Sequence, residues 1–159
     1  MSLARIALAL VSATVLVAAE KYIGPRPPKV DVPYLMHADN LVETEVGKAR
    51  SEERKDVVIA TIPGASSPVK TPLSEPIFII KTDKLVVDKI QAYRLQVKNG
   101  QREVVVNAKN VKNVQRPLHL QVTKLDERLY RVEVDEALEN GEYSLSPDGS
   151  DETFSFQVY

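Results

Sequence analysis

The chain of 159 residues contains no cysteine and no tryptophan. Small exported domains are often held together by disulfides, so this fold must depend on packing alone. None of its asparagines begins an Asn-x-Ser/Thr glycosylation signal. Together, the lack of cysteine and of this signal favours a bacterial exported protein over a eukaryotic secreted one. The only histidines, His37 and His119, are far apart in the sequence, whereas zinc sites need three or four protein ligands.

Long apolar runs are also scarce. The uncharged run from Ile6 to Ala19 has 14 residues and follows a single positive charge, Arg5, whereas a spanning helix needs about 20 apolar residues. This layout predicts a signal peptide at residues 1–19 with cleavage before Glu20, and an uncleaved anchor is the alternative. Because Arg5 is the only charge removed, the remaining 140 residues have a formal net charge of −2. We therefore expect one domain, no membrane span after cleavage, and no nucleic-acid partner.

Prolines are concentrated just after this segment. Residues 20–33 contain four of them, which favours an extended, polyproline-like path. We interpret these residues as a mobile linker.

Residues 34–75 are interpreted as an N-terminal extension with one or two strands and a charged loop. The alternation from Met36 to Val46 favours a strand, although Asn40–Glu43 can equally begin a helix. The charged run from Gly47 to Asp56 predicts a loop, and the apolar run from Val57 to Ile62 predicts a strand. The cluster Pro63–Pro68 then interrupts regular structure.

Residues 76–159 contain the clearest elements. Asn99-Gly100, flanked by alternating apolar residues, predicts a β-hairpin that pairs Leu95 with Val104 and Tyr93 with Val106. The opposite face of this hairpin is polar: Arg94, Gln96, Lys98, Gln101 and Glu103. A one-sided hairpin needs a covering layer, and we expect the alternating runs 118–123 and 130–135 to provide it.

Two further strands complete the pattern. Residues Ile77–Lys81 form an apolar run suited to a central strand or to an edge covered by the N-terminal segment. The last strand is expected to bury Phe154, Phe156 and Val158. Many short strands and no long helix predict an all-β antiparallel sandwich.

The sequence Gly141-x-Tyr143-x-Leu145 resembles the tyrosine corner of immunoglobulin-like domains. In such a corner, a tyrosine near the start of the penultimate strand hydrogen-bonds to backbone a few residues upstream. The resemblance covers roughly residues 76–159 and implies an immunoglobulin-like or fibronectin-type β-sandwich of bacterial exported proteins. The lack of tryptophan and of a disulfide excludes antibody-type domains.

Few residues are candidates for metal binding. His37 and Asp39 can supply two ligands of a weak metal site. A metal-dependent enzyme that uses these two residues is the least favoured functional hypothesis. Asp148, Ser150, Asp151 and Glu152 form an oxygen-rich loop that suits calcium but lacks EF-hand spacing. We interpret both groups as solvated surface, and we assign no metal-binding residue.

Candidates for catalysis and nucleic-acid binding are equally weak. Ser66 and Ser67 have no Gly-x-Ser-x-Gly context, and hydroxyls in proline-rich loops commonly serve turns. The carboxylates Glu133, Asp135, Glu136 and Glu139 fit a solvated face better than a glycosidase pair. The basic cluster Lys109, Lys112 and Arg116 has no interleaved aromatic residue for stacking on nucleic acid. We therefore assign no catalytic or cofactor-binding residue and expect the chain not to be an enzyme.

The leading hypothesis, reached by elimination, is a noncatalytic exported interaction module that binds another envelope or extracellular protein. The alternative is a polysaccharide-binding accessory domain, in which Tyr22, Tyr34 and Tyr159 serve as sugar platforms. An exposed row of tyrosines on one sheet face would favour the alternative, and a long unpaired edge beside the proline-rich arm would favour the leading hypothesis. Either function places the mature chain in the periplasm or outside the cell.

Overall fold

The computed structural model describes residues 21–54, 57–108 and 114–159. The predicted signal peptide lies outside the described residues. Thirteen strands and one short 3₁₀ turn, η1 (Val87–Lys89), form the regular structure of these three ranges. The all-β prediction is confirmed, with antiparallel pairing between nearly all neighbouring strands. Among the described residues, no helix has the length and hydropathy needed to cross a membrane.

The first sheet has five strands. Their order is β10 (Leu120–Asp126), β11 (Leu129–Val134), β7 (Ile77–Lys81), β1 (Pro33–His37) and β2 (Asn40–Glu43). Strand β7 lies in the middle, between β11 and β1, and the side chains of Phe78, Ile79 and Ile80 are buried. This agrees with the central position predicted from its uninterrupted apolar run.

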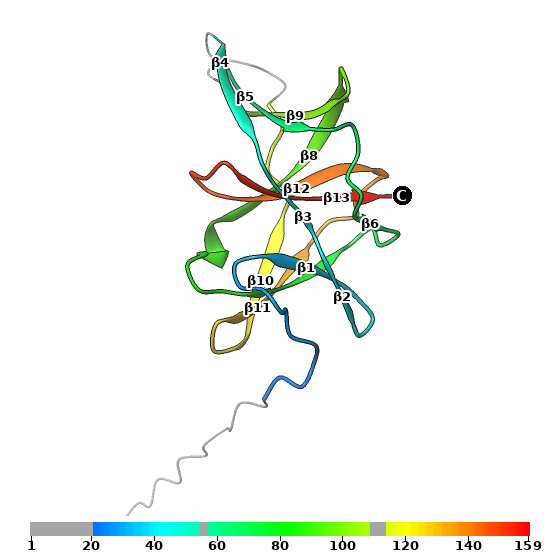
Figure 1. Cartoon of the computed structure of the whole chain (residues 1–159), viewed down its shortest axis with the longest axis vertical. Coiled ribbons are helices and arrows are strands. Elements are labelled where there is room, and N and C mark those ends of the chain that lie inside the picture. Colours follow the sequence, from blue (N-terminus) through cyan, green and yellow to red (C-terminus); the bar gives the residue numbers. More distant parts are fainter. Residues whose placement is uncertain (1–20, 55–56, 109–113) are drawn as a thin grey trace, which may run out of the picture.

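The second sheet has eight strands and bends strongly. Its main order is β3 (Glu45–Lys48), β13 (Glu152–Val158), β12 (Gly141–Pro147), β8 (Ile90–Lys98), β9 (Gln101–Ala108), β5 (Val57–Pro63) and β4 (Arg50–Arg54). The short strand β6 (Lys70–Thr71) adds to β13 in parallel. Strands β9, β5 and β4 form one end of the molecule, away from the first sheet (Figure 1).

The main hydrophobic core lies between the two sheets. Leu35, Phe78 and Ile80 from the first sheet pack in one cluster with residues of the second sheet, including Leu145 and Phe156. The rings of Phe78 and Phe156 meet edge to face, with centroids 5.1 Å apart. The predicted burial of the last strand is confirmed, because Phe154, Phe156 and Val158 are at most 3% exposed.

Residues 34–75 contribute strands to both sheets. Strand β1 pairs with β7 in the first sheet, and β3 pairs with β13 in the second. The single strand predicted over Met36–Val46 is wrong: β1 and β2 form an antiparallel hairpin that turns at Ala38, whose φ is 52°, and β3 begins at Glu45. These pairings join sequence-distant parts of the chain, so the N-terminal residues close one side of the sandwich.

The end of the proline-rich segment also contacts the domain. The Asp31 N–H donates to the Lys81 carbonyl at 2.7 Å, and its carboxylate accepts hydrogen bonds from the backbone N–H groups of Asp83, Lys84 and Leu85. Partial burial alone would raise the pKa of Asp31, but these hydrogen bonds outweigh it and hold that pKa below its usual value. The last residues of the predicted linker are thus anchored.

Two predictions about the second sheet are wrong. The loop predicted at Gly47–Asp56 is wrong over its described residues, 47–54, because Arg50–Arg54 form β4, paired with β5 from Arg50↔Thr61 to Arg54↔Val57. The hairpin at Asn99-Gly100 has the predicted register, but its ladder ends at Gln96↔Glu103. Beyond that point β8 pairs with β12 and β9 pairs with β5. The predicted pairs Leu95/Val104 and Tyr93/Val106 therefore lie outside the ladder.

The tyrosine at the predicted corner makes the expected contact. The Tyr143 hydroxyl donates to the Glu139 carbonyl, four residues upstream, at 2.7 Å. The ring is buried and stacks on Phe156, with centroids 5.6 Å apart. Gly141 is an ordinary strand residue and is not among the glycines with positive φ. A Cβ at this position would be 3.4 Å from Arg94 Nε, so the glycine provides room beside Arg94.

Removing the Tyr143 hydroxyl should cost one hydrogen bond. We expect Tyr143→Phe to lower the free energy of unfolding by about 0.5–1.5 kcal/mol, the usual net contribution of one such bond, measured from the urea midpoint. Tyr159→Phe is the matched control, because Tyr159 is 61% exposed, and its midpoint should equal that of the wild type. Equal midpoints for both variants would show that the corner bond adds no stability.

Candidate functional site

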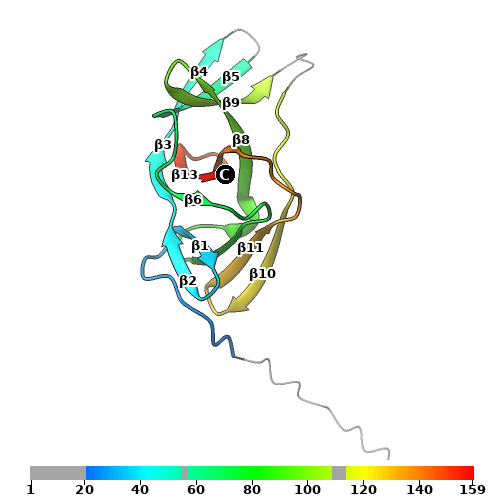
Figure 2. The same ribbon diagram turned by 90° about the vertical axis from the view of Figure 1, so that its right-hand side faces the viewer.

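The strands β2, β3 and β4 follow one another in the chain, residues 40–54, and each is an edge strand. Strand β2 ends the first sheet beside β1, whereas β3 and β4 are the two opposite ends of the second sheet, beside β13 and β5. They run along one side of the molecule from the first sheet to the far end of the second (Figure 2). No described strand pairs with their outer side. We call residues 40–54 the long edge.

Some backbone groups of the long edge point outward. The Ala49 N–H donates to the Asp151 carbonyl at 2.8 Å, and Gly47 faces Thr153 in the ladder. Successive backbone groups of a strand point to opposite sides. The N–H and C=O groups of Val46 and Lys48 therefore point away from β13. The Val46 side chain is 51% exposed, so this part of the edge also offers apolar surface.

Charges dominate the far part of the long edge. All five residues of β4 are exposed, and four of them are charged: Arg50, Glu52, Glu53 and Arg54. Charged side chains on an edge strand oppose uncontrolled pairing with other edges. The long edge thus has an apolar part at β2 and β3 and a charged part at β4.

A buried arginine fastens the long edge to the second sheet. The Arg102 side chain is 0% exposed and makes a two-pronged ion pair with Glu45, at 2.7 and 2.9 Å. Its guanidinium also donates to the backbone carbonyls of Pro63 and Gly64, at 2.8 and 3.0 Å. Glu142, which is also buried, lies 3.7 Å from Arg102 and accepts from the Ser67 N–H at 2.9 Å.

This network sets the protonation state of Glu45. Partial burial alone would raise the pKa of Glu45. The hydrogen bonds from Arg102 and Ser67, together with the positive charge of Arg102, outweigh burial and hold this pKa below its ordinary value of 4.5. Ser67 is buried, and its hydroxyl lies 3.3 Å from the Ser155 carbonyl. Ser66 donates to a neighbouring carbonyl. The hydroxyls of both Ser66 and Ser67, the weak nucleophile candidates, therefore hydrogen-bond to backbone carbonyls.

A cavity of about 440 Å³ lies on the face of β8, β12 and β13 that is opposite the main core. Its apolar floor is a second cluster of side chains: Ala49, Ala60, Ile62, Tyr93, Leu95, Val104 and Val106. The expectation that residues 118–135 cover the hairpin is wrong, because Leu118, Leu120 and Val122 pack against the main core. The curled strands β9, β5 and β4 cover this face only in part.

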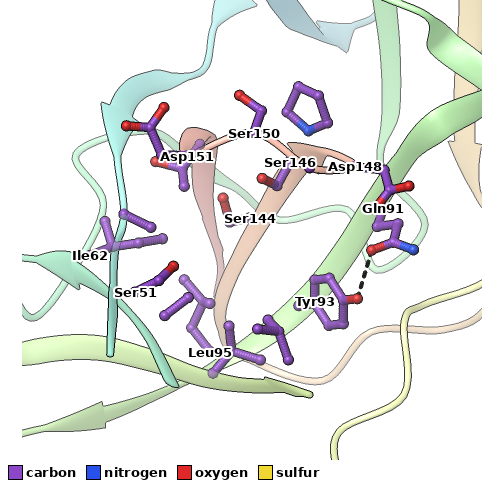
Figure 3. A pocket seen from close by; sticks show the side chains of 17 residues that line it. Ser51, Ile62, Gln91, Tyr93, Leu95, Ser144, Ser146, Asp148, Ser150 and Asp151 are labelled. Carbon is purple, nitrogen blue, oxygen red and sulfur yellow. Dashed lines mark hydrogen bonds between the residues drawn. The ribbon is translucent and has the colours of Figure 1, made fainter. Parts of the chain in front are cut away.

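The rim of the cavity is polar (Figure 3). It includes the predicted oxygen-rich turn, with Asp148, Ser150 and Asp151, and the serines Ser51 and Ser146. The Tyr93 hydroxyl donates to Gln91 Oε1 at 2.8 Å. Burial, followed by the charge of Asp148, raises the pKa of Tyr93, which keeps this hydroxyl protonated. No lysine, arginine or histidine is among the described residues that line the cavity.

The metal candidates do not converge. His37 Nε2 lies 2.9 Å from Thr71 Oγ1, and Asp39 is exposed in the turn after β1. In the oxygen-rich turn, the Glu152 N–H donates to Ser150 Oγ at 3.1 Å, as in an ordinary turn. Within the described ranges, no group of three or more His, Cys, Asp or Glu residues is arranged to hold a metal ion.

The other charged candidates are mostly engaged in surface pairs. Glu136 pairs with Arg116 at 2.7 Å, Glu139 with Arg94 at 2.6 Å, and Glu133 with Arg131 at 2.7 Å. Asp135 is exposed. The hydrogen bonds from Arg116 and the His119 N–H hold the pKa of Glu136 below its usual value despite slight burial. Lys109 and Lys112 lie outside the described residues.

The tyrosines proposed as sugar platforms do not form a row. Tyr34 is 3% exposed and donates to Glu43, whereas Tyr159 is exposed at the end of the chain. The Tyr22 ring lies 5.8 Å from the Arg26 guanidinium. Tyr93, which the sequence places in the predicted hairpin, lines the cavity described above.

Comparison with known proteins adds no identification: the chain matches no family model, no curated protein and no solved structure.

Proposed function

We propose that this chain is a noncatalytic exported interaction module that binds a segment of another envelope or extracellular protein along the long edge. The observation that carries this proposal is the open outer side of β3, where the backbone groups of Val46 and Lys48 point away from β13. An extended peptide can add to such an edge as an extra strand, with main-chain hydrogen bonds giving affinity and side-chain contacts giving selectivity.

The long edge suits one kind of partner. At about 3.3 Å per residue, the four residues of β3 offer roughly 13 Å of open strand. A partner segment with apolar residues would pack against Val42 and Val46, which are 37% and 51% exposed. Mixed-sign charges on the same segment would pair with Arg50, Glu52, Glu53 and Arg54. These charges also support selectivity, because a segment with the wrong charge pattern is repelled.

We further infer an immunoglobulin-like sandwich. The hydrogen bond from the Tyr143 hydroxyl to the Glu139 carbonyl supports this inference, as does the packing of two mainly antiparallel sheets. In such folds, function is carried by edges and loops, which fits a binding role for the long edge. The proposed export rests on the sequence of residues 1–19 alone, and either the periplasm or the exterior is compatible with it.

The test uses a substitution that closes the edge without breaking the sheet. Because the Lys48 N–H points away from β13, Lys48→Pro removes an outward donor and no ladder bond, and proline is tolerated at such edge positions. A photoreactive residue at Val46 of the full-length chain should capture a protein partner in cells. We expect Lys48→Pro to reduce this adduct by about two- to tenfold for the lost hydrogen bond alone.

The matched control is Lys48→Ala, which removes the charge and the 3.5 Å contact with Asp151 but keeps the backbone N–H. Its adduct should be close to that of the unsubstituted chain. Equal adducts from Lys48→Pro and Lys48→Ala, with both variants folded by circular dichroism, would contradict strand addition at β3.

A further inference from the structure

The cavity beside the long edge lacks part of its expected packing. Every residue of the second apolar cluster lines it, so the wall of the cavity on this side is apolar, although Ile62, Leu95 and Val104 are at most 5% exposed. Apolar atoms without partners forfeit dispersion energy, and ligand sites typically occupy about 300–1,000 Å³. The cavity, at about 440 Å³, has the size and the apolar floor of a site for a small molecule.

The charge around the cavity selects the kind of molecule. Asp148 and Asp151 are on the rim, and no basic side chain is among the described lining residues. Lys48 approaches Asp151 to 3.5 Å from outside the lining. Asp148 takes part in none of the ion pairs found among the described residues. Asp148 is therefore the carboxylate available to an incoming cation.

A hydrogen-bond acceptor stands near this carboxylate. The Tyr93 hydroxyl uses its proton in the bond to Gln91 Oε1, so its oxygen lone pairs remain available to accept from a ligand. Serine hydroxyls on the rim add further polar partners, Ser51, Ser146 and Ser150. Figure 3 shows Asp148, Gln91 and Tyr93 on one side of the cavity, and Ile62 and Ser51 on the other.

We propose that the cavity binds a small organic cation, an ammonium group carried on an apolar body. The ammonium is held by Asp148 and the Tyr93 oxygen, and the apolar body packs on the floor formed around Ile62, Leu95 and Val104. The floor is too apolar for a sugar, whose hydroxyls would lose their hydrogen bonds there. This inference goes beyond the proposed protein binding and does not depend on it.

Three probes with the same apolar body test the proposal: phenylbutylamine, phenylbutanol and phenylbutyrate. Titrations of the mature chain at pH 7 should be followed by amide chemical shifts. We expect saturable binding of the amine with shifts at Tyr93 and Asp148, an affinity for the alcohol weaker by about tenfold, and the weakest binding for the carboxylate.

Three variants locate the site. Asp148→Asn should reduce affinity for the amine to about that of the alcohol, whereas Asp135→Asn, at an exposed carboxylate that does not line the cavity, should change nothing. Ser51→Trp places a large side chain from the exposed strand β4 over the cavity and should block all three probes. The proposal is overturned if the alcohol binds as well as the amine, if Asp148→Asn has no effect, or if the amine does not bind saturably.

Discussion

Replacing Arg102 with methionine should lower the free energy of unfolding at pH 7 by about 3–5 kcal/mol, the cost of removing one partner from a buried ion pair. Methionine keeps most of the volume but removes the charge. The carboxylates of Glu45 and Glu142 would then share a partly dry site without a cation, and the carbonyls of Pro63 and Gly64 would lose their donors. Chemical denaturation measures the loss.

The pH dependence provides a second signature of this network. The pKa of Glu45 in the folded protein lies below its ordinary value of 4.5, so its contribution to stability is present above about pH 4.5. That contribution is lost as the pH falls through the folded pKa. The difference in stability between the wild type and Arg102→Met should therefore shrink at low pH. A difference that is constant across this range would contradict the assigned role of Glu45.

The control for Arg102 is Arg54→Met. Arg54 pairs with Glu52 on the surface, where its side chain is 64% exposed, and exposed pairs contribute little. We expect the free energy of unfolding to remain nearly unchanged. If Arg102→Met were as mild as Arg54→Met, the buried network would not fasten the long edge to the sheet.

Truncating Phe156 to alanine should also cost about 3–5 kcal/mol, as is typical for a buried aromatic residue. The Phe156 side chain is 0% exposed and lies between Phe78 of the first sheet and Tyr143 of the second. Its removal leaves a cavity at the centre of the sandwich. The denaturant midpoint measures the loss.

Val97→Ala is the control for the loss of apolar volume, because Val97 is 54% exposed near the hairpin turn. Its free energy of unfolding should change by less than about 0.5 kcal/mol, as measured from the denaturant midpoint. A loss for Phe156→Ala close to that of Val97→Ala would show that the two sheets are not joined by the core described here.

Much of the fold could be predicted because its signals are local. The alternation of Phe154, Phe156 and Val158 gave the buried face of β13, and Asn99-Gly100 gave a turn with the correct register. Strand β4 was missed because Arg50–Arg54 contain no apolar residue, so no period is visible. Pairing with β5 determines this strand, and that pairing is a tertiary effect.

The candidate site was less predictable. Arg102 could have been noticed, because it is two residues from Val104 on the same strand and so points to the same, buried face. A charged residue on a buried face indicates an ion-pair partner that is also buried. The partner itself, Glu45, is 57 residues away and could not be identified by spacing. The cavity arises where β9, β5 and β4 curl over β8, so only its rim at Asp148 and Asp151 was apparent as an oxygen-rich turn.

The central claim is that the long edge is open in the free chain and closed in the complex, and amide hydrogen exchange tests it most directly. In the free protein, Val46 and Lys48 should exchange rapidly, while Ala49, whose N–H donates to Asp151, should be protected. In the complex with the partner captured from position 46, Val46 and Lys48 should become protected as well. If both amides still exchange rapidly in that complex, the partner does not add as a strand and the claim is wrong.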